Sequence, residues 1–245
     1  MRYPIFHDRK TGQPIWMSLT GHVLLSGSTG SGKSVAMLHG VHCLACLSPP
    51  GDTLQILDYK MSRDWKELRG INGYWSFESA KEGFNRAYQL FRKQLEGREP
   101  IGDNIHWLII DEFASLSEAY TDKKERAEFL RRFGEMMRLS RNIGDGKGGW
   151  RIWVSVQQAN SELFGSTQAR SQFFLRILVG GVSSEGKRML FEKDDSDPTE
   201  VTSSPPGKGF AQTYGEKILK IIFPYENRRK LVFTRIKTML ERSTL

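Results

Sequence analysis

The sequence predicts an α/β fold in which a mostly parallel central sheet is flanked by helices. Apolar runs of strand length alternate with helical patterns along the 245 residues, which is typical of such a sheet. The stretch GSTGSGKS, residues 27–34, joins one apolar run to one helical pattern and is rich in glycine and serine. A second apolar run, HWLII, leads directly into Asp111 and Glu112. With no linker dividing the chain, we expect one domain over residues 1–245.

The elements follow in order from the residue patterns. Residues 1–20 predict an N-terminal hairpin, which turns around Lys10 to Gln13. The apolar runs predict strands at 22–25, 53–57, 106–110, 151–156 and 174–179, and the helical patterns predict helices at 33–47, 79–96 and 124–142. The polar, proline-containing segment 194–207 predicts an exposed loop.

The last segment, 208–245, predicts a hairpin followed by a basic tail. The hairpin turns at Tyr214 and Gly215. The tail RRKLVFTRIKTML is basic and apolar at once, which suits partner docking or DNA steering as well as an ordinary edge element.

The composition favours a chain that meets polyanions. Lysine and arginine number 36 against 28 acidic residues, which gives a net charge of +8. The N-terminal stretch is charged and lacks the apolar core of a signal peptide, and no run approaches the roughly 18 apolar residues of a membrane span. We therefore expect a cytoplasmic protein without an intrinsic membrane span.

The stretch at 27–34 has the spacing G-x-x-x-x-G-K-[ST] of a phosphate-binding loop. In such a loop, backbone N–H groups converge on the phosphates, the lysine reaches the outer phosphates and the hydroxyl of the last residue helps to hold Mg²⁺. The sequence therefore predicts that ATP and Mg²⁺ bind here, with Lys33 on phosphate and Ser34 on the metal. The predicted loop residues are Gly27, Ser28, Thr29, Gly30, Ser31, Gly32, Lys33 and Ser34.

Two later strands end in polar residues that fit the same site. An apolar, buried strand would deliver Asp111 and Glu112 to the carboxyl edge of the sheet, where the phosphate loop also lies. There Asp111 can hold the Mg²⁺ shell and Glu112 can activate water as general base. The strand RIWVSV ends in Gln157 and Gln158, and a glutamine at this edge can contact the γ-phosphate. An acidic pair that caps a surface helix, and glutamines that cap a loop, are the structural alternatives.

With these motifs in place, the sequence resembles the FtsK/HerA superfamily of ring-forming DNA-pumping ATPases. The closest resemblance is to its FtsK/SpoIIIE branch, as carried by Gram-positive conjugative elements. The markers that carry it, in the family's order, are HVLLSGSTGSGKS, ILDYK, LIIDEFASL, LSRNIG, VSVQQAN, FFLRILVGGVSSEGKRMLF and PGKGF. They span residues 21–224.

The resemblance implies a RecA-like P-loop NTPase fold of the ASCE class and roles for further residues. It implies that Gln158 is the nucleotide sensor and that Asp58 and Lys60 support the site. It also implies that one of three arginines stabilises transition-state charge on a neighbouring subunit's nucleotide. These three candidates are Arg141, Arg176 and Arg188.

The function implied is ATP-driven translocation of DNA by a homo-oligomeric ring, with a hexamer expected. The DNA would be double-stranded and bound without sequence preference, in conjugative or mobile-element transfer, with relaxase or secretion machinery as partners. A viral genome-packaging ATPase of the same type is one alternative. A nucleotide-gated switch that binds DNA or protein without processive motion is another.

Three departures from the family pattern narrow this function. The loop at 144–149 is longer than the family's, and Ala159 and Asn160 replace an arginine-proline pair. The membrane spans and winged-helix DNA reader of cell-division translocases are not found in the sequence, so a chromosome-dimer role is not expected.

Candidate DNA contacts lie in the helix predicted at 124–142 and in the loops beside it. An apolar stripe contains Phe129, Phe133, Met136, Met137 and Ile143, while Lys124, Arg131 and Arg138 recur on another stripe. That basic stripe favours a solvated helix face. The loops at 119–124 and 144–150 are better candidates for phosphate contacts.

Overall fold

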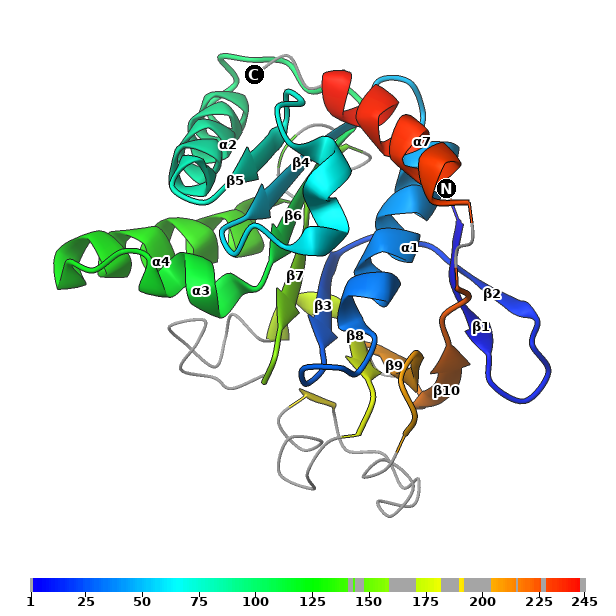
Figure 1. Cartoon of the computed structure of the whole chain (residues 1–245). Helices are drawn as coiled ribbons and strands as arrows, with labels where there is room; N and C mark the ends of the chain where they lie inside the picture. The colour runs from blue at the N-terminus through cyan, green and yellow to red at the C-terminus, as the bar shows by residue number, and fades with distance from the viewer. Residues whose placement is uncertain are drawn as a thin grey trace.

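Ten strands form one sheet in the part of the chain that the structure describes (Figure 1). The structure is a computed structural model and describes residues 2–140, 143, 148–158, 171–181, 190–191, 204–214, 216–225 and 228–242. The strand order is β2-β1-β10-β9-β8-β3-β7-β6-β4-β5. The strands are β1 (Tyr3–Asp8), β2 (Pro14–Met17), β3 (His22–Ser26), β4 (Thr53–Asp58), β5 (Tyr74–Ser76), β6 (Ile105–Asp111), β7 (Gly149–Val156), β8 (Phe173–Val179), β9 (Lys208–Thr213) and β10 (Leu219–Ile222).

The sheet is parallel from β8 to β5 and antiparallel from β9 to β2. Strands β8, β3, β7, β6, β4 and β5 all run in one direction, whereas β9, β10, β1 and β2 pair antiparallel with their neighbours. This confirms the predicted mostly parallel sheet and both predicted hairpins. It also brings the loops after β3, β4, β6 and β7 to one edge, because parallel strands share their carboxyl edge.

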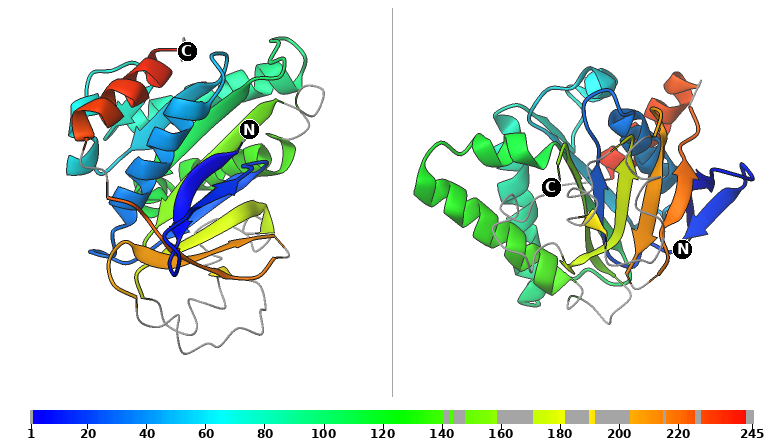
Figure 2. Two further views of the ribbon diagram at one scale, coloured as in Figure 1. Left: turned by 90° about the vertical axis from the view of Figure 1, so that its right-hand side faces the viewer. Right: turned by 90° about the horizontal axis from the view of Figure 1, so that it is seen from below.

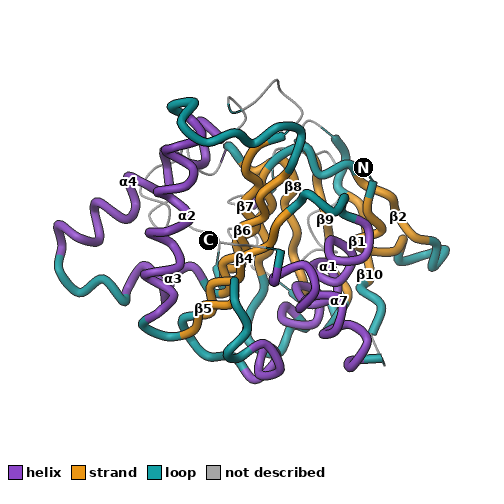
Figure 3. The backbone as a smooth tube through the Cα atoms, turned by 90° about the horizontal axis from the view of Figure 1, so that it is seen from above, coloured by secondary structure: helices purple, strands orange, loops and turns teal. Residues whose placement is uncertain are grey.

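Helices cover both faces of the sheet (Figures 1 and 3). Helices α1 (Lys33–Leu47) and α7 (Arg229–Glu241) lie side by side on one face (Figure 2). Helices α2 (Ser79–Leu95), α3 (Phe113–Glu118) and α4 (Lys123–Leu139) lie on the other. A 3-10 helix, η1 (Arg63–Leu68), follows β4 and contacts α1 and α7. Each face of the sheet therefore buries its own apolar cluster.

Helix α4 buries the apolar stripe that its sequence predicts. Phe129, Phe133, Met136 and Met137 are at most 2% exposed, as is Ile143 beyond the helix. The side chains of Lys124, Arg131 and Arg138 face solvent. The helix ends at Leu139; residues 141–142 of its predicted span lie outside the described part.

The structure adds elements that the sequence patterns did not predict, namely β5, η1, α3 and α7. The last of these changes the interpretation of the C-terminal tail, because 229–241 form a helix with a buried apolar face. That face consists of Val232, Phe233, Ile236, Met239 and Leu240. Of the loop predicted at 194–207, only 204–207 are described. Among the described residues, no helix is both long enough and apolar enough to cross a membrane.

Candidate nucleotide site

The loop between β3 and α1 has a backbone that only glycine adopts easily. Gly30 and Gly32 have φ values of 80° and 92°, in the left-handed region that disfavours other residues. A Cβ on Gly32 would also lie 2.7 Å from the backbone nitrogen of Gly207. The loop ends at the amino terminus of the 15-residue helix α1, where unpaired N–H groups favour an anion.

Two glycines at the ends of the neighbouring strands β8 and β9 lie against this loop. The Gly207 N–H donates to the Ser31 carbonyl at 2.9 Å. A Cβ on Gly180, which follows β8, would lie 2.7 Å from the Ser31 Cβ. Within the family-like segment PGKGF, glycine suits position 207 because the backbone there has φ 75°, in the left-handed region that disfavours other residues.

A pocket of about 410 Å³ opens over the loop. Its lining comes from the segments that follow β3, β4, β6 and β7, which the parallel sheet brings to one edge. The lining residues are Ser28, Thr29, Gly30, Gly32, Lys33, Ser34, Val35, Lys60, Ser62, Asp64, Asp111, Glu112 and Gln157. The structure therefore brings the predicted phosphate loop and the predicted acidic pair together.

Glu112 binds the phosphate-loop lysine. Its Oε2 lies 2.7 Å from Lys33 Nζ and 3.9 Å from Lys60 Nζ. Its Oε1 accepts a hydrogen bond from the Gln157 backbone N–H at 3.3 Å. The residue itself is left-handed, with φ 57° and ψ 73°, a conformation that costs a non-glycine residue about 1–3 kcal/mol.

Both oxygens of the Asp111 carboxylate are oriented by hydrogen bonds. Trp65 Nε1 donates to Oδ2 at 2.9 Å, and Ser155 Oγ donates to Oδ1 at 2.7 Å. The same Ser155 hydroxyl accepts the Glu112 backbone N–H at 2.9 Å. One serine on β7 therefore fixes the side chain of the first acid and the backbone of the second.

The residues in this pocket fit Mg²⁺. The Asp111 carboxylate and the Ser34 hydroxyl both line the pocket, and oxygen atoms are the ligands that Mg²⁺ prefers. Each Asp111 oxygen accepts one described hydrogen bond, which leaves it acceptor capacity. Ser34 and Asp111 would hold the ion together with substrate phosphates.

Asp58 lies beside Asp111 on the neighbouring strand and is fully buried. Burial, reinforced by the charge of Asp111, raises the pKa of Asp58 to about 6 despite the hydrogen bond from the Tyr74 hydroxyl at 2.7 Å. This places a second carboxyl group next to Asp111, the predicted Mg²⁺ ligand. Lys60 follows two residues later and lines the pocket.

The predicted glutamines and arginines do not all line the nucleotide pocket. Gln157 lines the pocket, whereas Gln158, the predicted sensor, is exposed and is not among the lining residues. Arg176 is 5% exposed within β8. Arg141 and Arg188 lie outside the described residues.

Sequence reasoning did not find Trp65, Ser155 or Tyr74, which orient the two buried aspartates. The position of Ser155 gave a weak indication of its role, since it lies two residues before Gln157 on a strand already assigned to the site. Nothing in the sequence indicated the roles of Trp65 and Tyr74, because the local pattern around an aromatic residue does not reveal which carboxylate its N–H or O–H will bind.

Solved structures share this fold. The cytoplasmic domain of the Thermomonospora curvata type VII secretion ATPase EccC matches with a TM-score of 0.70 at 18% identity, over 98% of this chain and 31% of that one. The pCW3 conjugation coupling protein TcpA, a monomer form with ATPγS, matches with a TM-score of 0.66 at 17% identity, over 95% of this chain and 69% of that one. The packaging NTPase B204 of Sulfolobus turreted icosahedral virus 2 matches with a TM-score of 0.50 at 13% identity, over 86% of this chain and all of B204.

The chain thus spans about a third of the EccC chain. No protein-family model and no curated protein matches the sequence. The predicted resemblance is confirmed at the level of the fold, which the chain shares with these ATPases.

Proposed function

We propose that this protein hydrolyses ATP with Mg²⁺ and uses the energy to move double-stranded DNA, as a ring of identical subunits, during transfer of a mobile element. One observation carries the enzymatic part. The phosphate-loop Lys33, the Mg²⁺ ligand Asp111 and the general base Glu112 meet in one pocket. These are the groups that phosphoryl transfer to water requires.

The chain's own residues divide the chemistry between them. Backbone N–H groups of the loop and the Lys33 ammonium bind the phosphates, and bound Mg²⁺ would neutralise charge on their oxygens. Glu112 accepts a proton from the attacking water, whose oxygen bonds to the γ-phosphorus while the bond to the ADP oxygen breaks. ADP leaves with that electron pair.

The Lys33–Glu112 ion pair suggests how binding prepares the base. Lys33 has three N–H donors, and phosphate oxygens compete with Glu112 for them. As Lys33 turns to the phosphates, Glu112 Oε2 loses its 2.7 Å partner and becomes able to accept a proton. The hydrogen bond that the Glu112 N–H donates to Ser155 Oγ, and the one that Glu112 Oε1 accepts from the Gln157 N–H, keep Glu112 at the pocket meanwhile.

Support for DNA as the substrate comes from charge and fold. The net charge is +8, and two proteins of the same fold are a conjugation coupling protein and a genome-packaging NTPase. Proteins of this fold also include secretion ATPases, one of them in complex with a signal sequence peptide. A secreted protein is therefore the competing substrate, and packaging is the competing setting.

Support for a ring comes from the surface beside the pocket. Met61 and Phe77 are 40% and 51% exposed, and both have positive φ. They border a groove that shares Lys60 with the nucleotide pocket. Exposed apolar side chains held at strained positions favour a subunit contact at this edge, from which Arg141 or Arg188 of a neighbour would reach the nucleotide. We expect a hexamer.

Triplex displacement tests the proposal directly. The wild-type protein with ATP should displace a third strand from duplex DNA, because a translocating ring removes obstacles in its path. Glu112→Gln should bind the same DNA and displace nothing. ATP hydrolysis that is indifferent to DNA but increases with a secretion-signal peptide would overturn the DNA assignment in favour of a secretion ATPase.

A further inference from the structure

A dense group of cations lies on η1 and the start of α7, outside the nucleotide pocket. Six exposed side chains form it, and we name them the η1–α7 basic surface: Arg63, Lys66, Arg69, Arg228, Arg229 and Lys230. A hollow of about 670 Å³ lies at its centre. Its lining is entirely charged and consists of Arg63, Asp64, Lys66, Glu67, Arg69 and Arg229.

The cations of this surface form no ion pair within the part of the chain that the structure describes. Among the described residues, no carboxylate oxygen lies within 4.0 Å of a side-chain nitrogen of any of the six. Their described contacts lead to backbone oxygens and, for Arg229, to the Phe233 ring, whose centroid lies 5.7 Å from the guanidinium carbon. Arg69 donates to the Met61 carbonyl at 3.1 Å, and Arg229 donates to the Asp64 carbonyl at 3.4 Å. Their charge is therefore available to an anion from outside.

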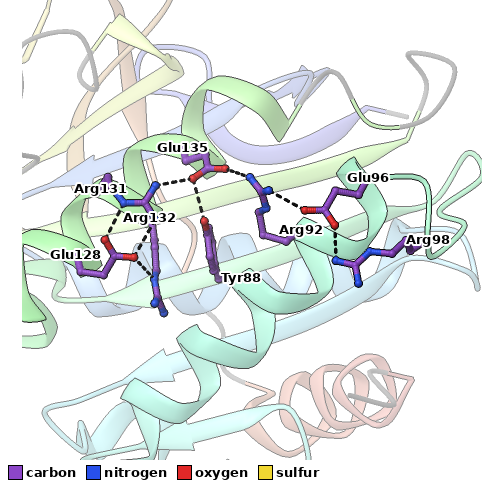
Figure 4. A network of polar contacts seen from close by, with 8 residues as sticks. All are labelled: Tyr88, Arg92, Glu96, Arg98, Glu128, Arg131, Arg132 and Glu135. Carbon is purple, nitrogen blue, oxygen red and sulfur yellow. Dashed lines mark hydrogen bonds and ion pairs between the residues drawn. The ribbon is translucent and has the colours of Figure 1, made fainter.

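The other arginine-rich surface of the molecule is different. On α2, the turn after it and α4, four arginines are bound to glutamates in a continuous network (Figure 4), namely Arg92, Arg98, Arg131 and Arg132. Arg131 lies 2.7 Å from Glu128 and 3.0 Å from Glu135, and Arg132 lies 2.8 Å from Glu128. This network joins the two helices and leaves little net charge for a polyanion. Both surfaces are rich in arginine, but only the cations of the η1–α7 basic surface are free of described ion pairs and can bind an external anion.

The chemistry of the hollow favours the phosphates of a duplex. No described aromatic side chain lines it, so its described lining offers no platform for the stacking by which proteins hold single-stranded bases. It also lacks the apolar or aromatic anchors on which protein partners depend. A row of arginine and lysine side chains does suit regularly spaced phosphates, without reading sequence.

The same short helix also reaches the active site. Within η1, Trp65 turns inward and donates to Asp111 Oδ2 at 2.9 Å, while Arg63 and Lys66 on either side of it are exposed. Asp64 lines both the hollow and the nucleotide pocket. An anion bound at the basic surface would therefore act on η1, the helix whose Trp65 orients Asp111.

We propose that the η1–α7 basic surface binds the phosphate backbone of double-stranded DNA and that this contact stimulates ATP hydrolysis through η1. The proposal rests on the proposed function for the identity of the polyanion. It adds a DNA contact on the outer face of η1 and α7, separate from the loops at 119–124 and 144–150.

Two triple variants with matched charge test it. Arg63→Gln/Lys66→Gln/Arg229→Gln neutralises the surface, and Arg86→Gln/Lys93→Gln/Arg98→Gln is the control. The control also removes two arginines and one lysine from exposed positions, here on α2 and the turn after it. Both triples remove three positive charges, so long-range attraction falls equally. Matching melting temperatures, within about 2 °C, verify that both fold.

The measurement is fluorescence anisotropy of a labelled random duplex with the full chain across a salt series. The surface triple should bind at least about tenfold more weakly than the control, with a salt slope smaller by about 2 to 3, because each lost phosphate contact removes about 0.9 from the slope. Its basal ATP turnover should equal that of the wild type, while its stimulation by DNA should be lost.

The outcomes separate this inference from the proposed function. If the wild type binds and is stimulated by DNA, and both triples behave alike, the surface assignment is wrong and the proposed function stands. If the wild type hydrolyses ATP but binds no duplex, both the DNA function and this inference are wrong. If only poly-glutamate binds, and only the surface triple loses it, the surface docks an acidic protein segment instead.

Discussion

Glu112 is the residue at which backbone strain, an ion pair and the proposed chemistry coincide. Its left-handed conformation is maintained by the Ser155 hydroxyl on its N–H and by Lys33 and the Gln157 amide on its carboxylate. Strain persists only where the surroundings over-determine it, and such positions cluster at functional sites. Here the strain turns the carboxylate toward the phosphate loop rather than along the strand axis.

Two substitutions in this ion pair should have different effects. Lys33→Ala should abolish ATP turnover and weaken nucleotide binding sharply, because the loop loses the cation that faces the outer phosphates. Glu112→Gln should retain nucleotide and Mg²⁺ but lose at least about a hundredfold in turnover, because only the base is neutralised. Fluorescent-nucleotide titration and phosphate release measure the two effects. Equal loss of binding in both variants would contradict the division of roles.

The buried Asp58 should make stability depend on pH. Its pKa is about 6 in the folded protein against an ordinary value of 3.8. Between these values the folded state binds more protons than the unfolded state, so the free energy of unfolding decreases as pH rises through this window. Asp58→Asn removes this slope. Relative to wild type, the free energy of unfolding of the variant should rise by about 1–3 kcal/mol between about pH 4 and pH 7.

Urea denaturation at a series of pH values measures this difference. Tyr74→Phe is the companion variant, because it keeps Asp58 and removes the described hydrogen bond that favours the ionised form. It should extend the pH-dependent window upward. An Asp58→Asn profile parallel to that of the wild type would show that Asp58 does not titrate in this range.

At the scale of the element, α7 is part of the core although its sequence resembles a basic tail. One face buries Ile236 and Phe233 against α1, β4 and η1, while Leu231 is 44% exposed. The exposed cations Arg228, Arg229 and Lys230 lie at its amino-terminal end. A single helix therefore carries both a packing face and half of the basic surface.

Paired substitutions on α7 test this packing. Ile236→Ala should lower the free energy of unfolding by about 2–4 kcal/mol, because the site is fully buried and a cavity would remain. Leu231→Ala should change it by less than about 1 kcal/mol, since the side chain already contacts water. Chemical denaturation measures both. A small effect at Ile236 would mean that 229–241 are a dispensable tail after all.

At the scale of the whole molecule, the pocket lies at an edge of the sheet and next to a groove that Met61 and Phe77 border. Phosphoryl transfer of this class commonly uses an arginine supplied by another chain. Arg176 is buried in its own sheet, which favours Arg188 and Arg141 for that role. A complete active site would then need two subunits.

ATP turnover per chain should accordingly rise with protein concentration. Changing Arg188, Arg141 or Arg176 to alanine should identify the residue that acts between subunits, because that variant alone should bind nucleotide and not hydrolyse it. Mixing it with Lys33→Ala should restore part of the activity, since the Lys33 variant still offers its arginine to a neighbour with an intact loop. Turnover independent of concentration, with no rescue in any mixture, would rule out the ring.

The sequence by itself determined the sheet, its covering helices and the chemistry-bearing residues. Strands at 22–26 and 105–111 were predictable because they are buried on both faces and are therefore continuously apolar. The phosphate loop was predictable because its glycines are needed locally, whatever the rest of the chain does. Lys33, Asp111 and Glu112 could be assigned to one site because parallel strands share an edge.

Only the tertiary structure decided what depends on contacts between distant segments. Trp65 and Ser155 meet Asp111 across 46 and 44 positions of sequence, and no local pattern encodes such a pairing. The short elements β5, η1 and α3 have too few residues for a period to show. The tail became a helix because α1 and β4 offer an apolar surface to one of its faces. The cations of η1 and α7 form one surface because the fold places 63–69 beside 228–230.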